Sequence, residues 1–173
     1  MFRKPSANAK ILWMVVILAM IADQVSKVLV ESTMDLGQSV AILGDFFRLT
    51  FIRNAGGAFG IFLGGGWFYL VASAVAVAMI FFYLRSLATD QLLPRVSLAM
   101  ILGGALGNLA DRLRCGVVTD FLDFGFGRVR WPVFNLADAF VTVGVLAFLF
   151  SMLQRNKEVQ KTFEKTERSQ AGQ

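Results

Sequence analysis

The feature that most constrains this chain is a set of long apolar runs, each close to the length of a membrane crossing. Four of them lie at about residues 11–30, 67–84, 94–110 and 133–153. A helix needs about 20 mostly apolar residues to cross roughly 30 Å of hydrocarbon. Isolated strands would leave backbone groups unpaired there, so runs of this kind are expected to be helices. The sequence therefore predicts an all-α membrane protein, a bundle of four transmembrane helices.

Composition agrees with this class. The chain is 56% hydrophobic and 17% charged over 173 residues, whereas soluble domains are roughly 45–50% apolar and about 25% charged. We expect one polytopic membrane domain over residues 1–155. A polar cytoplasmic tail over 156–173 is expected to be solvated or disordered.

The first apolar run has a second interpretation, as the core of a cleavable signal peptide. A basic start, Met1–Lys10, precedes the apolar stretch Ile11–Ala22, which is the order of such a peptide. The sequence Ile21-Ala22-Asp23 lacks the A-x-A pattern of a cleavage site, and a second apolar run follows without a soluble domain. We therefore expect the first run to remain as a helix.

The distribution of basic residues predicts the topology. Ten lysines and arginines lie in the terminal segments and the turn over 85–95, against seven in the other two loops and their flanks. Basic flanks face the cytoplasm, so both termini are expected there and the loops Glu31–Gly66 and Asp111–Pro132 outside. The net charge of +5 thus belongs to membrane flanks. Without a folded basic face carrying stacking aromatics, the sequence predicts no nucleic-acid partner.

The first outward loop contains two segments with the character of strands. Ser39–Leu43 and Phe46–Ile52 are rich in branched and aromatic residues and flank a Gly44-Asp45 turn. The glycine-rich stretch Asn54–Gly60 is expected to break regular structure. The prediction is a small extracytoplasmic β-sheet between helices 1 and 2, at the outer membrane surface.

Ionisable residues inside the apolar runs are the main functional signal, because a charge in hydrocarbon is costly. Asp23 and Lys27 lie four residues apart and share one helix face. A structural ion pair and a functional role are equally compatible with this spacing.

Polar residues also share one face of the third run: Asn108, Asp111 and Arg112 are spaced i, i+3, i+4. Gly103 and Gly107 in the same run form a small-xxx-small pair, which predicts close approach of a neighbouring helix.

Further carboxylates lie near the outward end of the fourth run. Asp120 and Asp123 are flanked by apolar residues, and partial burial raises the pKa of a carboxyl. Asn135 and Asp138 share a helix face. Asp138 lies roughly 7–8 Å into its helix, too deep for so short a side chain to reach water. We expect it to have a function within the bundle.

The absence of histidine narrows the chemistry. With no histidine and one cysteine, Cys115, imidazole-based hydrolysis, histidine-ligated zinc and an intramolecular disulfide are excluded. Two carboxylates around one water can hydrolyse an amide, one protonated and one acting as base. A Ser-Lys dyad is the other route. It would need Lys27, the only lysine between residues 11 and 156, but the adjacent Ser26 points to a different helix face.

Five short motifs, taken in order, resemble the lipoprotein signal peptidase (signal peptidase II) family, membrane-embedded aspartic peptidases of bacteria. They are Asp23–Lys27, Arg53–Phe59, Gly103–Arg112, Val118–Phe121 and Phe134–Asp138. The resemblance extends over most of the chain. Gly57 is one departure, at a position where the family more often has alanine.

The resemblance implies roles for individual residues. Asp120 and Asp138 match the catalytic pair, and Asp111 and Asp123 fit structural roles. The polar residues that line the site or hold the substrate are implied to be Asp23, Asn54, Asn108, Arg112 and Asn135. The family uses no metal and no organic cofactor.

The resemblance also implies an activity and a location. The activity is removal of the signal peptide from prolipoproteins whose lipobox cysteine carries diacylglycerol, with sensitivity to globomycin-type cyclic peptides. The location is the bacterial cytoplasmic (inner) membrane, among phospholipids, with the active site at the outer (periplasmic) face.

Two other functions are compatible with parts of the sequence. A small proton- or cation-coupled transporter subunit could use Asp23, Asp111 and Asp138 as an ion path. Such a path needs polar groups at several depths, and the second run carries none. A non-catalytic membrane scaffold would leave the outward group of acids unexplained.

Overall fold

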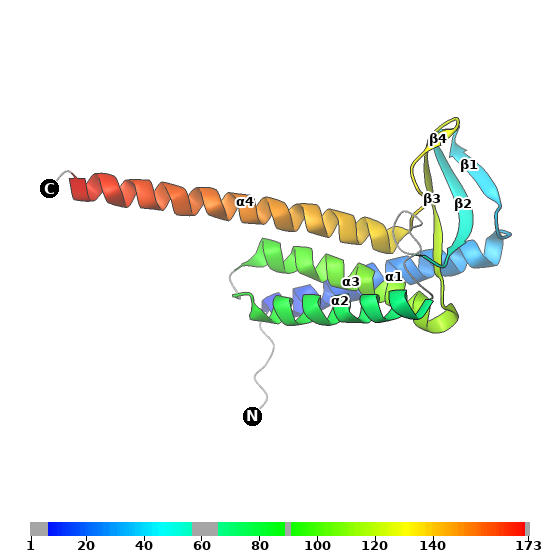
Figure 1. Ribbon diagram of the computed structural model, residues 1–173, viewed down its shortest axis with the longest axis horizontal. Helices are drawn as coiled ribbons and strands as arrows, with labels where there is room; N and C mark the ends of the chain where they lie inside the picture. Colours follow the sequence, from blue (N-terminus) through cyan, green and yellow to red (C-terminus); the bar gives the residue numbers. More distant parts are fainter. Residues whose placement is uncertain (1–6, 57–65, 89–90, 172–173) are drawn as a thin grey trace, which may run out of the picture.

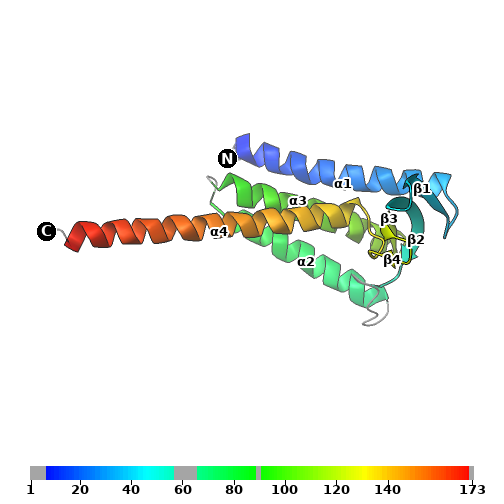
Figure 2. The same ribbon diagram turned by 90° about the horizontal axis from the view of Figure 1, so that it is seen from above.

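The computed structural model describes residues 7–56, 66–88 and 91–171. Within these ranges, four helices are long and apolar enough to cross a membrane. They are α1 (Ala7–Thr33), α2 (Gly66–Ser86), α3 (Leu92–Cys115) and α4 (Leu136–Ala171). The helices run side by side with a small sheet at one end, while α1 begins and α4 ends toward the opposite end (Figures 1 and 2). The predicted set of four membrane-length helices is confirmed.

The fourth helix differs most from its predicted range. It begins at Leu136 and continues to Ala171, whereas the apolar run over 133–153 predicts an earlier start and an earlier end. The expected disorder from residue 156 is therefore corrected, because the backbone is helical as far as Ala171. Solvation of this segment stays a prediction. Glutamate, lysine, glutamine and arginine dominate this part of the sequence, and all four residue types favour helix.

The glycines of α3 bring the helices close together. α3 is the central helix and contacts α1, α2 and α4. A Cβ at Gly103 would overlap Val16 and Ala19 of α1, and a Cβ at Gly104 would overlap the carbonyl oxygen of Ala137 on α4. The predicted packing role of Gly103 is confirmed. α1 is an integral part of this packing.

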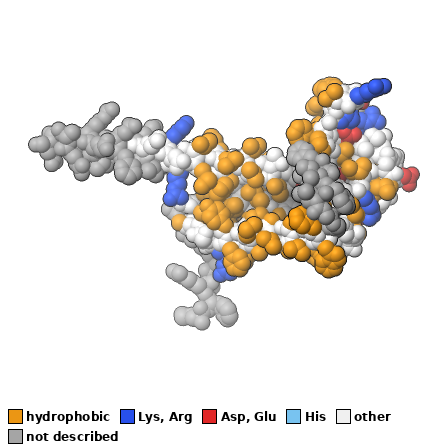
Figure 3. Space-filling model, in the orientation of Figure 1, with side chains coloured by type: hydrophobic (Ala, Val, Ile, Leu, Met, Phe, Trp, Pro, Cys, Tyr) orange, Lys and Arg blue, Asp and Glu red, His pale blue; other side chains and the backbone are white. Residues whose placement is uncertain are grey.

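Outside these contacts the helices present apolar surface. Figure 3 shows a hydrophobic band over the helices, with basic side chains at the end away from the sheet and charged side chains of both signs around the sheet. α2 carries no charged residue before Arg85. Its exposed side chains include Trp67, Val71, Met79 and Phe82, a surface suited to lipid.

The sheet is antiparallel, with strand order β1-β2-β3-β4. β1 (Ser39–Leu43) and β2 (Phe47–Asn54) confirm the predicted strands. β3 (Val118–Phe126) and β4 (Val129–Arg130) were not predicted and follow α3. The prediction of a sheet formed only between helices 1 and 2 is therefore corrected. Aspartate disfavours strands, and the two aspartates within β3 hid its alternating Val, Thr and Phe character.

Candidate active site

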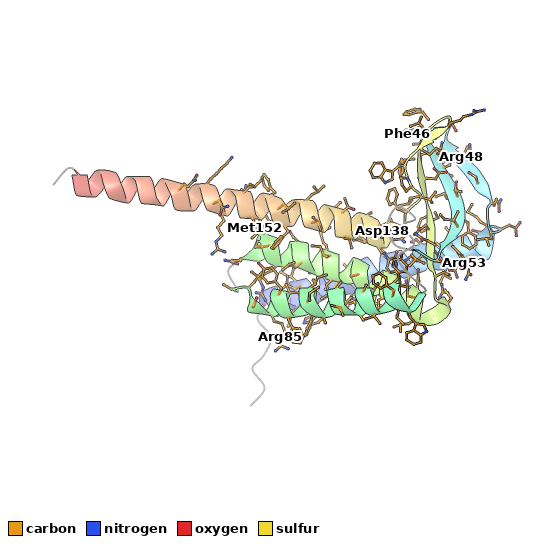
Figure 4. The ribbon with its side chains drawn as sticks, in the orientation of Figure 1. Phe46, Arg48, Arg53, Arg85, Asp138 and Met152 are labelled. Atoms are coloured by element: carbon orange, nitrogen blue, oxygen red, sulfur yellow. The ribbon has the colours of Figure 1, made fainter. Side chains whose placement is uncertain are left out.

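A cavity of about 570 Å³ lies where the sheet meets the ends of α3 and α4. Figure 4 shows Asp138 at this junction, far from Met152 and Arg85 at the other end of the bundle. The polar side chains of the cavity come from β2, α3, β3 and α4, and they are Asn54, Asn108, Arg112, Asp120 and Asp138. The rest of the wall is largely apolar and includes Val118, Trp131, Pro132, Val133, Phe134 and Val141. Six of the seven residues that the sequence assigned to the site are accounted for by this cavity and its immediate contacts.

Asp138 is positioned by the way α4 begins. The side-chain Oδ1 of Asn135 accepts the backbone N–H of Asp138 at 3.0 Å, and Asp138 Oδ2 accepts the backbone N–H of Asn135 at 3.4 Å. This reciprocal pair is a capping box, which satisfies donors that a helix start otherwise leaves unpaired. The N-terminal end of a helix also favours negative charge. The sequence thus fixes a carboxylate in the first turn of α4 without strain.

Asp120 lies in the middle of β3 and is almost completely buried, with 1% of its surface exposed. The Nδ2 of Asn135 donates to its Oδ1 at 2.6 Å, and the Nδ2 of Asn54 donates to its Oδ2 at 3.0 Å. The pKa of Asp120 is raised to about 6, mainly by burial and also by the negative charge of Asp138, against the lowering effect of the hydrogen bonds from Asn54 and Asn135 and of the Lys27 charge. The expected effect of apolar surroundings on this carboxyl is confirmed.

Asn135 joins the two carboxylates. Its side chain donates to Asp120 and accepts from the backbone of Asp138, and it is itself fully buried. The two aspartates therefore meet one shared residue as well as one shared cavity. In the sequence they are separated by a strand, a turn and a second short strand.

Asn108 and Arg112 complete the polar side of the cavity from α3. Asn108 Nδ2 donates to Asp138 Oδ1 at 2.8 Å, and its own Oδ1 accepts from Asn135 Nδ2 at 3.2 Å. Arg112 donates to the backbone oxygen of Asn108 at 3.3 Å, so most of its five donors are left for other partners in the cavity.

Asp23 lies behind the cavity instead of lining it. It is fully buried, and its Oδ1 accepts the backbone N–H of Ala137 at 2.9 Å. Gly107 leaves room for it, because a Cβ there would overlap the Asp23 carboxylate. Asp23 therefore supports the start of α4 directly beside Asp138.

Lys27 connects Asp23 to a second buried carboxylate. Its Nζ lies 2.8 Å from Asp23 Oδ2 and 2.8 Å from Asp111 Oδ2. The ion pair that the Asp23–Lys27 spacing predicts is present. The structural role implied for Asp111 stays a prediction, with which its contact with Lys27 is consistent. Ser26 donates to the backbone oxygen of Asp23 at 2.7 Å, which leaves no Ser-Lys dyad here.

Asp123 lies three residues beyond Asp120 on the same strand but has different partners. It accepts from Arg130 Nε at 2.6 Å and from Thr50 Oγ1 at 2.6 Å. These contacts join β3 to β4 and β2, and the structural role implied for Asp123 stays a prediction.

Glu31 is a support that the sequence analysis missed. It accepts from Thr119 Oγ1 at 2.6 Å and forms an ion pair with Arg114 at 2.7 Å. Thr119 immediately precedes Asp120, so Glu31 anchors that strand to α1. The repeat of Asp23, Lys27 and Glu31 at every fourth position was the available signal.

Among the residues that the structure describes, no three His, Cys, Asp or Glu side chains are grouped as metal ligands would be. Gly57, together with the rest of the glycine-rich stretch after Gly56, lies outside the described residues.

Comparison with known proteins now adds an independent finding. A family model described as "Signal peptidase (SPase) II" matches residues 15–154. The chain belongs to the signal peptidase II family. The lipoprotein signal peptidase of Syntrophus aciditrophicus is 40% identical to this signal peptidase II homologue over 146 residues, covering 82% of this chain and 91% of the relative. That of Symbiobacterium thermophilum is 44% identical over 142 residues, covering 82% and 93%.

Solved structures agree with the family assignment. A protein described as a bacterial membrane enzyme superposes on this signal peptidase II homologue with a TM-score of 0.80 at 30% identity, covering 91% of this chain and 95% of the other. A second structure with the same description gives a TM-score of 0.75 at 31% identity, covering 83% and 93%. The resemblance read from the five motifs is confirmed.

Proposed function

We propose that this chain is an intramembrane aspartic endopeptidase that removes signal peptides from diacylglyceryl-modified bacterial prolipoproteins. Asp120 and Asp138 are the proposed catalytic pair. The observation that carries this assignment is that β3 and α4 present their carboxylates to one cavity and that Asn135 donates to both, from its side chain to Asp120 and from its backbone N–H to Asp138. Family membership supports the substrate class, since the relatives are lipoprotein signal peptidases.

In the proposed mechanism the two carboxyl groups share one proton, since two close carboxylates resist ionising together. We assign the proton to Asp120, which is buried, and the charge to Asp138 at the start of a helix. Asp138 takes a proton from water, whose oxygen adds to the scissile carbonyl carbon while Asp120 protonates the carbonyl oxygen. As the C–N bond breaks, Asp138 passes its proton to the leaving nitrogen and the diol returns one to Asp120.

The walls of the cavity suit a lipid-anchored peptide. Asn54 and Arg112 offer hydrogen-bond donors for peptide and ester carbonyls. From Asp138 the cavity continues along α4 past Val141, Thr142 and Val143, and the last of these has 52% of its surface exposed. On the lipid-facing side of a membrane helix this apolar strip would hold acyl chains. A globomycin-type cyclic peptide would compete for the same cavity.

The proposed location is the bacterial cytoplasmic (inner) membrane, with residues 1–155 as the membrane domain and 156–173 as a polar cytoplasmic tail, which is helical as far as Ala171. The sheet and the cavity would lie at the outer face, in contact with phospholipid headgroups, and both termini in the cytoplasm. A cysteine-accessibility scan in a Cys115→Ser background tests this orientation. Positions in β1 should be labelled from outside, and positions beyond residue 156 only after permeabilisation. The reverse pattern would invert the model.

The direct test of function is a gel-shift assay with purified full-length protein and a diacylglyceryl-modified prolipoprotein. The expected result is loss of the signal peptide from the modified substrate and inhibition by globomycin. A matched prolipoprotein with serine in place of the lipobox cysteine cannot be lipidated and should stay uncut. Absence of cleavage of the modified substrate would refute the proposal.

A further inference from the structure

Lys27 is buried behind the cavity, with 1% of its surface exposed. Besides the carboxylates of Asp23 and Asp111, its Nζ contacts Asn108 Oδ1 at 2.9 Å. A lysine ammonium has three donors and no acceptor. All three donors therefore have partners, two of them charged and one a neutral amide.

The contact with Asn108 determines how that amide is oriented. An asparagine side chain carries an acceptor oxygen and a donor nitrogen on opposite arms. Because Lys27 can only donate, the oxygen of Asn108 must face it, and Asn135 Nδ2 donates to the same oxygen at 3.2 Å. The nitrogen then faces Asp138 Oδ1 at 2.8 Å. A flipped amide would set its NH₂ group against the ammonium and its oxygen against the carboxylate, so both contacts would be repulsive.

We propose that Lys27 is a positioning residue that acts through Asn108: it fixes the amide so that Asn108 donates to Asp138 and holds that carboxylate ready to accept a proton from water. The inference rests on the proposed function of Asp138 as the base. Lys27 itself does not line the cavity and touches neither carboxylate of the proposed pair.

Charged groups approach Asp138 from three other elements of the structure. Asp120 faces the same cavity from β3, and Arg112 does so from α3. From α1, Lys27 reaches Asp138 only through Asn108, with Asp23 and Asp111 beside the ammonium. The two carboxylates offset the Lys27 charge, and the hydrogen-bonded path from Lys27 to Asp138 runs through Asn108.

The test is a double-mutant cycle in an Asp111→Asn background. Removing Lys27 alone would leave two buried carboxylates without the lysine charge between them, whereas the combination Lys27→Met and Asp111→Asn keeps the net charge of the cluster. In this background, Lys27→Met is expected to lower turnover per folded molecule about tenfold to a hundredfold, as for loss of a hydrogen bond to a charged group. Added to Asn108→Ala, the same change should have almost no further effect, because the amide it orients is gone.

A second readout separates positioning from stability. The acid limb of the pH profile of kcat/KM should move to higher pH in the Lys27→Met protein, since the dyad is then harder to ionise. Arg48→Met is the matched control: it removes a positive charge and breaks a partly exposed ion pair with Asp45 at a side chain that does not line the cavity, and it should leave turnover and the pH profile unchanged.

Two results would overturn the inference. One is that the Lys27→Met and Asn108→Ala changes lower turnover by independent factors that multiply in the combined variant. The other is that Lys27→Met lowers the melting temperature but leaves turnover and the pH profile unchanged. Failure of the proposed function is distinguishable, because the wild-type protein would then not cleave the diacylglyceryl-modified substrate at all.

Discussion

Asp120 and Asp138 are the same chemical group held by two different local structures. Asp120 lies inside a strand, nearly without exposure, between the amides of Asn54 and Asn135. Asp138 lies in the first turn of a helix, partly exposed to the cavity, where the backbone favours negative charge. The strand environment favours the protonated form and the helix start favours the charged one. Different supports thus give two identical side chains different proposed roles.

The largest expected effect comes from removing either carboxyl. Asp120→Asn and Asp138→Asn keep size and polarity but supply neither acid nor base. Each is expected to lower the rate of prolipoprotein cleavage by about a thousandfold or more while the protein still inserts in the membrane. The measurement is single-turnover cleavage with the folded fraction determined by size-exclusion chromatography. Substantial processing by either variant would exclude that residue from the pair.

The second prediction tests the protonation of Asp120 through stability. Its pKa is raised from 3.8 to about 6 by burial, so folding favours the protonated form. The associated stability is fully present below the unfolded pKa and is lost as the pH rises through about 6. Between about pH 4 and about pH 7 the wild type should lose on the order of 3 kcal/mol relative to Asp120→Asn, which cannot titrate there.

Thermal unfolding of both proteins in the same detergent measures this difference. Parallel pH dependence in the wild type and in Asp120→Asn would show that Asp120 is not the group with the raised pKa.

The third prediction concerns Arg112, which faces both carboxylates from α3. Arg112→Lys keeps the positive charge but loses the planar arrangement of five donors. We expect folding to be retained and turnover to fall by about tenfold to a hundredfold. Turnover and melting temperature measured on one preparation distinguish a substrate-binding role from a structural one. Near-wild-type turnover of Arg112→Lys would show that Arg112 does not bind the substrate.

The smallest effect on turnover is expected at Asp123, on the same strand as Asp120. Its ion pair with Arg130 is partly exposed, with 7% and 22% of the two side chains accessible. Asp123→Asn should lower the melting temperature and change turnover by no more than about threefold. If Asp123→Asn instead lost as much turnover as Asp120→Asn, the assignment of a catalytic role to Asp120 and a structural role to Asp123 would be wrong.

The sequence predicted much of this fold because the membrane leaves few alternatives. Apolar runs identified the four helices, and Gly103 predicted the close approach of α1 and α3. β3 was not predicted because its two aspartates lower the strand propensity of the segment. The strand forms because its backbone pairs with β2, and this pairing cannot be read from local propensity. The continuation of α4 beyond residue 153 was also not predicted, because the polar composition of this segment was interpreted as a sign of disorder.

The site was predictable in its members but not in its contacts. Helix spacing placed Asn108 with Arg112 and Asp23 with Lys27, and the family resemblance supplied the pairing of Asp120 with Asp138. No spacing rule connects Lys27 to Asn108 or Asn135 to Asp120, because those contacts depend on how α1, α3, β3 and α4 pack together. Asp23 was expected at the site and lies behind it for the same reason.

The central claim is that the shared proton resides on Asp120. Infrared difference spectroscopy of the purified protein across the pH range around 6 tests it, because a protonated carboxyl has a carbonyl band distinct from the carboxylate bands. With the proton on Asp120, this band should titrate in the wild type, persist at low pH in Asp138→Asn and be absent from Asp120→Asn. A band that persists in Asp120→Asn and disappears in Asp138→Asn would contradict it.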